Sequence, residues 1–257
     1  MRAFGRTISI AAVLVSLAGM AAAADIRVLS VGAVQNAVRP LAAEFSKETG
    51  HKIVFTVGSP TVVAQKLKDG ETFDAVIVSE PAMDRLDNEG VVKPESRVRL
   101  ANTGIGVAVR AGAPAPNLAT PDTFKQALLA AKSVVYGDPA LPNQSGEKAE
   151  QILAKAGLLD ALKGKLRITP GQAEGQDLIT KGEVEMGLYN LSEIPEGKGL
   201  KIAGPVPAPL QLTTTYEGAL MSDGAVPEAA RAFIRFLAEP DARAKWIAAK
   251  LEPFADH

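Results

Sequence analysis

The repeated order of apolar run, turn and amphipathic segment is the feature that most limits the fold of this chain. Three such pairs follow one another at 26–49, 52–68 and 75–90. In each pair a short apolar run precedes a segment whose apolar residues recur every three or four positions, which is typical of a strand followed by a helix. Short connections between such elements build βαβ units, so the sequence predicts an α/β protein with largely parallel sheets.

The first 24 residues have the composition of an export signal. Arg2 and Arg6 precede an apolar stretch at 7–20, and three alanines at 22–24 come before Asp25. The apolar stretch is short for a membrane span, so a cleaved signal peptide is favoured over an anchor. We predict a signal peptide over residues 1–24, cleavage near Ala24 and a location in the periplasm.

Composition excludes several classes of site. The chain has 28 Lys and Arg against 29 Asp and Glu, a formal net charge of -1, which argues against a nucleic-acid partner. It has no cysteine and two histidines, His51 and His257. Thiolate metal sites, disulfides and cysteine nucleophiles are therefore excluded, and a histidine-based triad is nearly so. We expect no cofactor and no metal site.

Two strand-like runs, at 105–110 and 212–220, flank the middle third of the chain. A chain that leaves one domain, builds a second and returns needs two such crossings. We therefore predict two α/β lobes joined by a two-strand hinge, with a cleft between them. One lobe comprises 25–104 plus 211–257, and the other comprises 105–210.

Three strand-to-helix turns are candidate anion sites, at 30–35, 57–61 and 137–146. Free backbone N–H groups and the helix dipole favour an anion at such turns. Gly32 allows a tight first turn, while Ser59, Thr61 and Ser145 add hydroxyl donors. For each turn alone, simple helix capping is the alternative interpretation. Convergence of the three turns on one cleft would favour a binding site.

Tyr189 and Asn190 end another strand-like run, at 184–190, and precede Ser192 and Glu193. Side chains at this position can face a cleft. The alternative is a packed tyrosine with a satisfied hydroxyl group.

The order of these segments resembles the periplasmic molybdate-binding proteins of ABC transporters. The matching segments are 26–50, 57–70, 73–79, 137–139 and 185–189. The resemblance covers essentially the whole mature chain. It implies a type II periplasmic binding protein fold with one anion site in the cleft and a permease partner in the inner membrane. We also expect the protein to be a monomer.

The resemblance also implies ligand-binding positions. The family's first-turn hydroxyl falls on Ala33, its ligand tyrosine falls on Asn190, and Tyr189 stands one position earlier. A one-residue offset on a strand places a side chain on the opposite face. The predicted ligand-binding residues are Gly32, Ala33, Ser59, Thr61, Ser145, Gly146, Gln172, Tyr189 and Asn190.

A second resemblance comes from 96–114 and 124–133, which look like the branch of this superfamily that contains aconitate isomerase. That activity would need carboxylate clamps and an acid/base pair. Tyr189, Glu147 and Lys148 are the nearest candidates, and no catalytic residue is assigned. The sequence thus predicts a solute-binding protein of an ABC importer that binds a molybdate-like oxyanion or a small polycarboxylate. The alternative is an aconitate isomerase on the same fold.

Overall fold

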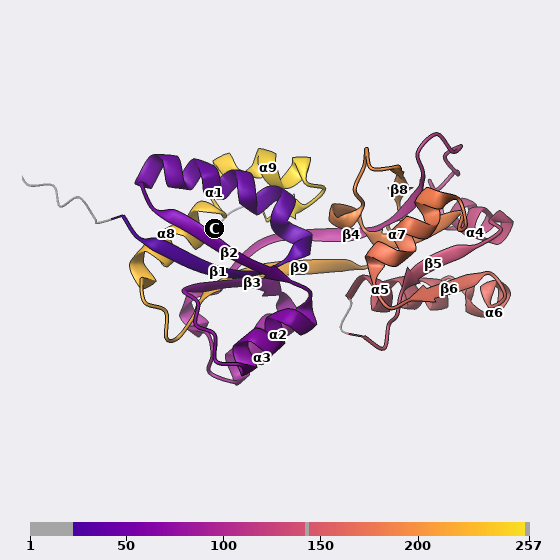
Figure 1. The fold of residues 1–257 in the computed structure, drawn as a ribbon. Helices are drawn as coiled ribbons and strands as arrows, with labels where there is room; N and C mark the ends of the chain where they lie inside the picture. Colours follow the sequence, from indigo (N-terminus) through magenta and orange to yellow (C-terminus); the bar gives the residue numbers. More distant parts are fainter. Residues whose placement is uncertain (1–22, 142–143, 255–257) are drawn as a thin grey trace, which may run out of the picture.

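A computed structural model describes residues 23–141 and 144–254 of the chain. The predicted signal peptide lies almost entirely outside these residues. In the described part, the strands form one sheet whose path is β2-β1-β3-β9-β4-β7-β5-β6, with β8 and β10 paired to β4. Helices flank the sheet along its length (Figure 1). The predicted α/β class is confirmed.

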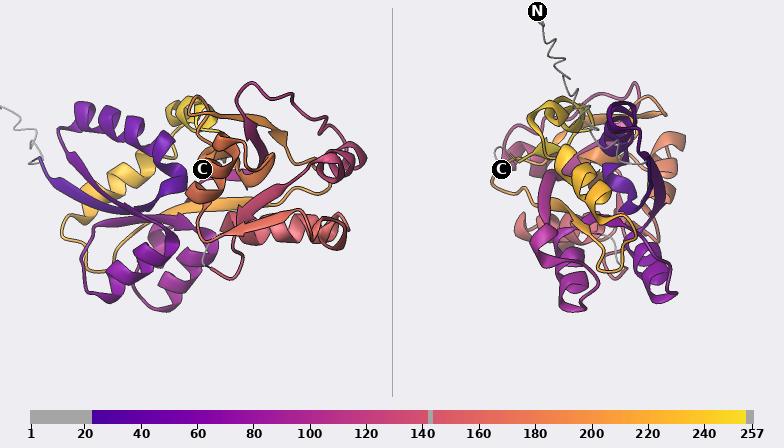
Figure 2. Two further views of the ribbon diagram at one scale, coloured as in Figure 1. Left: turned by 45° about the vertical axis from the view of Figure 1, so that its right-hand side comes forward. Right: turned by 90° about the vertical axis from the view of Figure 1, so that its left-hand side faces the viewer.

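The first half of the sheet contains the N-terminal and C-terminal parts of the chain. Here β1 pairs in parallel with β2 and β3, and β3 pairs with β9 in the antiparallel direction. Helices α1 and α9 lie on one side of these strands, and α2 and α3 lie on the other (Figures 1 and 2). The elements are β1 (Asp25–Val31), η1 (Gly32–Val34), α1 (Gln35–Thr49), β2 (Lys52–Gly58), α2 (Pro60–Lys68), β3 (Ala75–Ser79), α3 (Glu80–Asn88), η2 (Pro94–Ser96), β9 (Thr213–Leu220), α8 (Pro227–Phe236), η4 (Pro240–Ala242), α9 (Arg243–Ala248) and β10 (Glu252–Pro253).

The second half contains the middle of the chain. Here β5 pairs in parallel with β6 and β7, whereas β4 pairs with β7 and β8 in the antiparallel direction. The elements are β4 (Val98–Arg110), α4 (Pro121–Ala130), β5 (Val134–Gly137), α5 (Gln144–Lys155), α6 (Leu159–Leu162), β6 (Leu166–Thr169), α7 (Gln172–Lys181), β7 (Met186–Asn190), η3 (Leu191–Glu193) and β8 (Leu200–Pro205).

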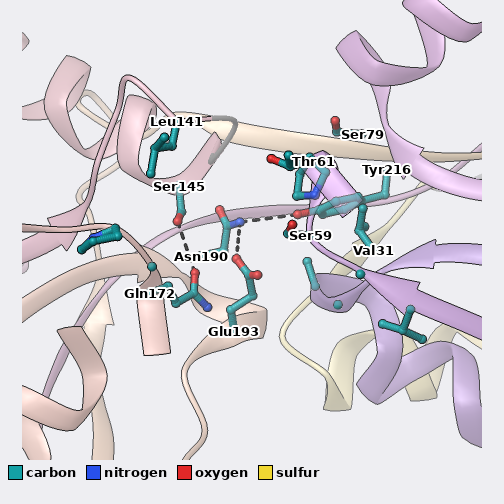
Figure 3. Close-up of a pocket in the computed structure, with 17 residues that line it drawn as sticks. Val31, Ser59, Thr61, Ser79, Leu141, Ser145, Gln172, Asn190, Glu193 and Tyr216 are labelled. Carbon is teal, nitrogen blue, oxygen red and sulfur yellow. Dashed lines mark hydrogen bonds between the residues drawn. The ribbon is translucent and has the colours of Figure 1, made fainter. Parts of the chain in front are cut away.

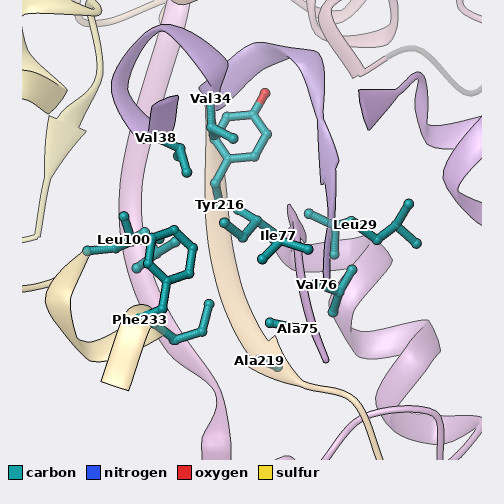
Figure 4. Close-up of a cluster of buried hydrophobic side chains, with 14 of the residues drawn as sticks. Leu29, Val34, Val38, Ala75, Val76, Ile77, Leu100, Tyr216, Ala219 and Phe233 are labelled. Carbon is teal, nitrogen blue, oxygen red and sulfur yellow. The ribbon is translucent and has the colours of Figure 1, made fainter. Parts of the chain in front are cut away.

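Each half has its own hydrophobic core. In the first half, Phe233 on α8 is fully buried among the side chains of this core (Figure 4). Its ring packs against Phe45 and Phe55, with ring centroids 5.3 and 6.4 Å away. Strand β3 is buried at every position, as expected for a continuous apolar strand covered on both faces. The second half buries a separate set around Phe124, Leu128 and Ile152.

Local sequence signals explain where the helices begin and end. Ser59 caps α2 by accepting a hydrogen bond from the Val62 N–H, and Pro60 occupies the first turn. Helix α1 ends at Gly50, whose φ of 77° is left-handed. Pro40 lies inside α1, and the helix continues through this residue. Buried side chains on its inner face, including Leu41, stabilise the helix despite the lost hydrogen bond.

Strand β4 passes from one half to the other. It pairs with β9 from Val98 to Gly104 and with β7 from Ile105 to Val109. The sequence indicated only a shorter strand-like run here, 105–110. The chain returns to the first half between β8 and β9, so two segments cross (Figure 1). We propose that the two halves are the lobes expected from the sequence, with the hinge at these crossings.

The side chain of Gln211 joins the two crossings. Its Oε1 accepts a hydrogen bond from the Ile105 N–H at 2.8 Å, and its Nε2 donates to the Ile105 carbonyl at 2.9 Å. The same Nε2 donates to the Val206 carbonyl at 3.1 Å. A Cβ at Gly104 would lie only 2.8 Å from the Gln211 side chain, so glycine is needed for this close approach.

We predict that Phe233→Ala lowers the free energy of unfolding by about 3–5 kcal/mol, because it removes a buried ring from a packed core. Chemical denaturation followed by circular dichroism measures the change. Ile247→Ala is the matched control, since Ile247 lies in the same half and is 52% exposed. The control should change the stability by less than about 0.5 kcal/mol. Equal effects of the two variants would contradict this assignment of the core.

Candidate functional site

A cavity of about 430 Å³ lies between the two halves (Figure 3). Its walls combine apolar groups with hydroxyl and carboxamide groups. The described residues that line it are Val31, Gly32, Ala33, Val57, Gly58, Ser59, Pro60, Thr61, Ser79, Leu141, Ser145, Pro170, Gly171, Gln172, Asn190, Glu193 and Tyr216.

The three turns that the sequence singled out meet at this cavity. The first contributes Gly32 and Ala33, the second contributes Ser59 and Thr61, and the third contributes Ser145. Positions 142–143 of the third turn lie outside the described residues. The convergence arises because the carboxyl ends of parallel strands, where helices begin, face the space between the halves.

Two further helix starts, which were not among the predicted turns, reach the cavity. Ser79 is the N-cap of α3, and Gly171 is the N-cap of α7, where no side chain caps the helix. Helices α2, α3, α5 and α7 therefore all begin at the cavity wall. Their N-terminal dipoles add a positive potential inside it.

The predicted site residues divide into two groups. Gly32, Ala33, Ser59, Thr61, Ser145, Gln172 and Asn190 all line the cavity, whereas Gly146 and Tyr189 are not among the lining residues. Contact of any of these residues with a ligand stays a prediction.

Tyr189 and Asn190 face opposite sides of β7, as their one-residue offset requires. Asn190 lines the cavity, whereas the Tyr189 side chain belongs to a hydrophobic cluster with Ile179 and Leu200. The Tyr189 hydroxyl group is buried and has no hydrogen-bond partner. Burial raises the pKa of this phenol. Tyr189 therefore supports the lobe behind the cavity.

Gly146 has a packing role in the third turn. A Cβ at this position would lie 2.2 Å from the carbonyl oxygen of Gly137, at the end of β5. Only glycine lets the first turn of α5 approach the strand so closely. This approach places the neighbouring Ser145 at the cavity, where its Oγ donates to Gln172 Oε1 at 3.4 Å.

A cluster of three polar residues, Asn190, Glu193 and Tyr216, forms one wall of the cavity (Figure 3). Asn190 Nδ2 donates to Glu193 Oε2 at 2.7 Å and to the Tyr216 hydroxyl oxygen at 3.4 Å. Asn190 and Glu193 come from the second half and Tyr216 comes from the first half. The cluster therefore joins the two halves through the cavity wall.

Glu193 and Tyr216 were not among the site residues predicted from the sequence. Glu193 follows β7 in the short helix η3. Its closeness to Asn190 in the sequence was the one signal that could have marked it as a site residue. Tyr216 lies inside β9, where nothing local distinguishes it from a core residue. The pairing of β9 with both β3 and β4 brings it to the cavity.

The electrostatic character of the cavity follows from its lining. None of the described lining residues is Lys, Arg or His. Burial raises the pKa of the Glu193 carboxyl group, while hydrogen bonds from Asn190 and Gln172 oppose that shift. Burial, together with the nearby Glu193, raises the pKa of Tyr216 well above its ordinary value. The positive potential thus comes from backbone dipoles.

The described residues contain no group of three or more His, Cys, Asp or Glu placed to hold a metal ion. Within the same residues, no helix is long and apolar enough to cross a membrane. The earlier acid/base candidates Glu147 and Lys148 belong to α5 but not to the cavity lining.

A two-part α/β fold with one cleft at the helix N-termini defines the class of solute-binding proteins. The sequence profile of the family described as bacterial extracellular solute-binding protein matches residues 26–249, and the chain belongs to this family. The predicted type II periplasmic binding fold is thereby confirmed, together with the resemblance to molybdate-binding proteins and aconitate isomerase.

Three relatives illustrate the range of the family. An aconitate isomerase from Pseudomonas sp. is 36% identical over 221 residues, covering 84% of this chain and 82% of its own. The molybdate-binding protein ModA of Azotobacter vinelandii is 25% identical over 241 residues, covering 88% and 89%. The substrate-binding domain of a molybdenum ABC transporter from Clostridium difficile superposes with a TM-score of 0.77 at 17% identity, covering 91% and 100%.

We predict that the folded protein keeps its tyrosines protonated to a higher pH than the unfolded chain does. The pKa values of Tyr136, Tyr189 and Tyr216, the three tyrosines of the chain, are all raised from 10.0. Because the unfolded chain loses these protons first, the folded state should lose stability as the pH rises above 10. Ultraviolet absorbance of the phenolate measures the titration, and the unfolded chain in denaturant is the control. Phenolate formation near pH 10 without loss of circular dichroism would contradict the prediction.

Proposed function

We propose that this chain is an exported solute-binding protein that holds a small polycarboxylate anion in its cleft and delivers it to an ABC transporter permease. The observation that carries the proposal is the cavity, where four helices begin among neutral hydrogen-bond donors. Backbone N–H groups and dipoles at helix N-termini bind anions without a basic side chain. Export of the chain to the periplasm is supported by the signal-like sequence at 1–24.

Three features favour an organic acid over a tetrahedral oxyanion. The cavity volume, about 430 Å³, falls within the range of about 300–1,000 Å³ that is typical of sites for organic ligands. Val31, Val57 and Leu141 supply apolar surface for a carbon skeleton. Ala33 lacks the hydroxyl group that the molybdate-binding proteins have at this turn. These features support a polycarboxylate as the ligand.

A second candidate function is isomerisation of aconitate. It is favoured by the identity of 36% to an aconitate isomerase and by two ionisable groups in the cleft, Glu193 and Tyr216. A proton shift between carbons needs a base near one C–H bond and an acid that stabilises the carboxylate side of the intermediate. In this alternative, Glu193 would take and return the proton while the Tyr216 hydroxyl group donates a hydrogen bond.

A thermal-shift panel tests the proposed function. It contains citrate, both aconitate isomers, molybdate, tungstate and sulfate. A ligand at about 100 times its dissociation constant should add about 2.7 kcal/mol to the stability of the folded state. We expect the carboxylates to raise the melting temperature. A shift with molybdate and tungstate alone would overturn the polycarboxylate proposal.

Thr61→Val tests whether the ligand binds in the cleft. The substitution keeps the shape of the side chain and removes a hydroxyl donor from the cavity. We expect the affinity for the stabilising carboxylate to fall about tenfold to a hundredfold, since hydrogen bonds to charged groups contribute about 1.5–3 kcal/mol. Calorimetry measures the change. Thr180→Val is the control, because Thr180 bonds the Gln176 carbonyl within α7 and does not line the cavity. Unchanged affinity in Thr61→Val would place the ligand elsewhere.

Proton NMR separates the two candidate functions. The protein is incubated with trans-aconitate in deuterated water, and the spectra are examined for cis-aconitate and for deuterium at carbon. A binding protein leaves the substrate unchanged. Conversion that is lost in both Glu193→Gln and Tyr216→Phe would establish the isomerase function.

A further inference from the structure

The anion cavity contains a carboxyl group, which is the least expected of its features. Glu193 lies in the wall of a cavity where helices α2, α3, α5 and α7 begin. An anionic ligand inside the cavity and an ionised Glu193 in its wall would repel each other. Arg, Lys and His are absent from the described lining residues, so no basic side chain there offsets the repulsion.

The groups that face Glu193 come from each neighbouring element. Strand β9 contributes Tyr216 and α7 contributes Gln172, and both side chains line the cavity with Glu193. The α7 residue Gln176 donates to the Glu193 backbone carbonyl at 2.9 Å. Asn36 on α1 approaches the backbone of η3 at the Ser192 carbonyl. Strand β4 pairs with β7 next to η3 through Ile105 and Gly106. Besides Glu193, the ionisable group in this set is Tyr216.

The same wall presents a second acceptor. Asn190 Oδ1 is buried and has no hydrogen-bond partner, while Asn190 Nδ2 is engaged by Glu193 and Tyr216. A fully ionised polycarboxylate brings acceptors and no donor to this wall. Where a ligand oxygen faces the Glu193 carboxyl group, a proton between the two oxygens replaces their repulsion with a hydrogen bond, and the Glu193 carboxyl group is the site in this wall that can accept that proton.

We propose that Glu193 is in its neutral acid form when an anion is bound, and that it donates a hydrogen bond to an oxygen of the ligand. The proton comes from the solvent, so binding takes up a proton wherever free Glu193 is ionised. This inference rests on the proposed function for its ligand class. It makes Glu193 a specificity-determining residue that couples affinity to pH.

The pH dependence of binding tests the inference. The dissociation constants of trans-aconitate and of sulfate are measured by calorimetry from pH 7 to pH 9.5, where both free anions are fully ionised. Because the bound state holds an extra proton, the affinity should fall as the pH rises, by about tenfold per pH unit on the steepest part of the curve. Titrations at one pH in HEPES and in Tris give the proton uptake directly. The expected uptake is between zero and one proton per ligand.

Matched variants test whether Glu193 is the residue that takes up the proton when the ligand binds. Glu193→Gln replaces the neutral acid with a neutral amide, so it should bind at high pH and show a flat pH profile within about twofold. Glu193→Asp keeps a carboxyl group and should keep the slope. Glu174→Gln is the control for loss of a negative charge, since Glu174 is exposed on α7 and lies outside the cavity lining. Circular dichroism confirms that each variant is folded.

Each outcome decides between explanations. A falling wild-type profile and a flat Glu193→Gln profile support the inference. A flat wild-type profile, or the same slope in Glu193→Gln, overturns it. If trans-aconitate fails to bind while sulfate binds with the predicted profile, the polycarboxylate proposal fails and the role of Glu193 stands. If neither anion binds at any pH, both proposals are overturned.

Discussion

The continuous strand β4 is the element on which the rest of the structure depends. Its first part pairs with β9 and its second part pairs with β7, so one strand belongs to both halves. Each half can therefore keep its own hydrophobic core, and the cavity lies where the two meet. Gln211 bonds the Ile105 backbone at this point and also contacts the returning segment at Val206. The hinge thus has a side-chain link between its two crossings.

The chemistry of the cavity follows from this arrangement. Parallel strands in both halves point their carboxyl ends to the same space, and helices begin there with the positive ends of their dipoles. The lining residues add hydroxyl and carboxamide groups, and Glu193 adds a carboxyl group among them. Such a site is suited to an anion. In the proposed role of Glu193, the protonation state of its carboxyl group also affects which anions bind.

Much of the fold could be predicted because periodicity is local. The runs that became β1, β2 and β3 and the helices after them were identified with small errors at the ends. Strands β6 and β8 were missed, since β6 is short with exposed side chains and β8 ends in Gly204 and Pro205, which are typical of a break. The three turns were recognised because capping residues are local signals. Glu193 and Tyr216 could not be paired from the sequence, because only strand order brings them together.

The dipolar lining has a consequence for the way the protein meets its ligand. The field of a helix terminus weakens within about a turn, and the whole chain carries a net charge of -1. An anion in the surrounding solution is therefore not drawn in from a distance, as it would be by a basic patch. The field of the helix N-termini therefore acts on an anion at the cavity itself. Ligand binding in this cleft therefore depends on short-range interactions. Dissolved salt should weaken it far less than it weakens binding between surface charges.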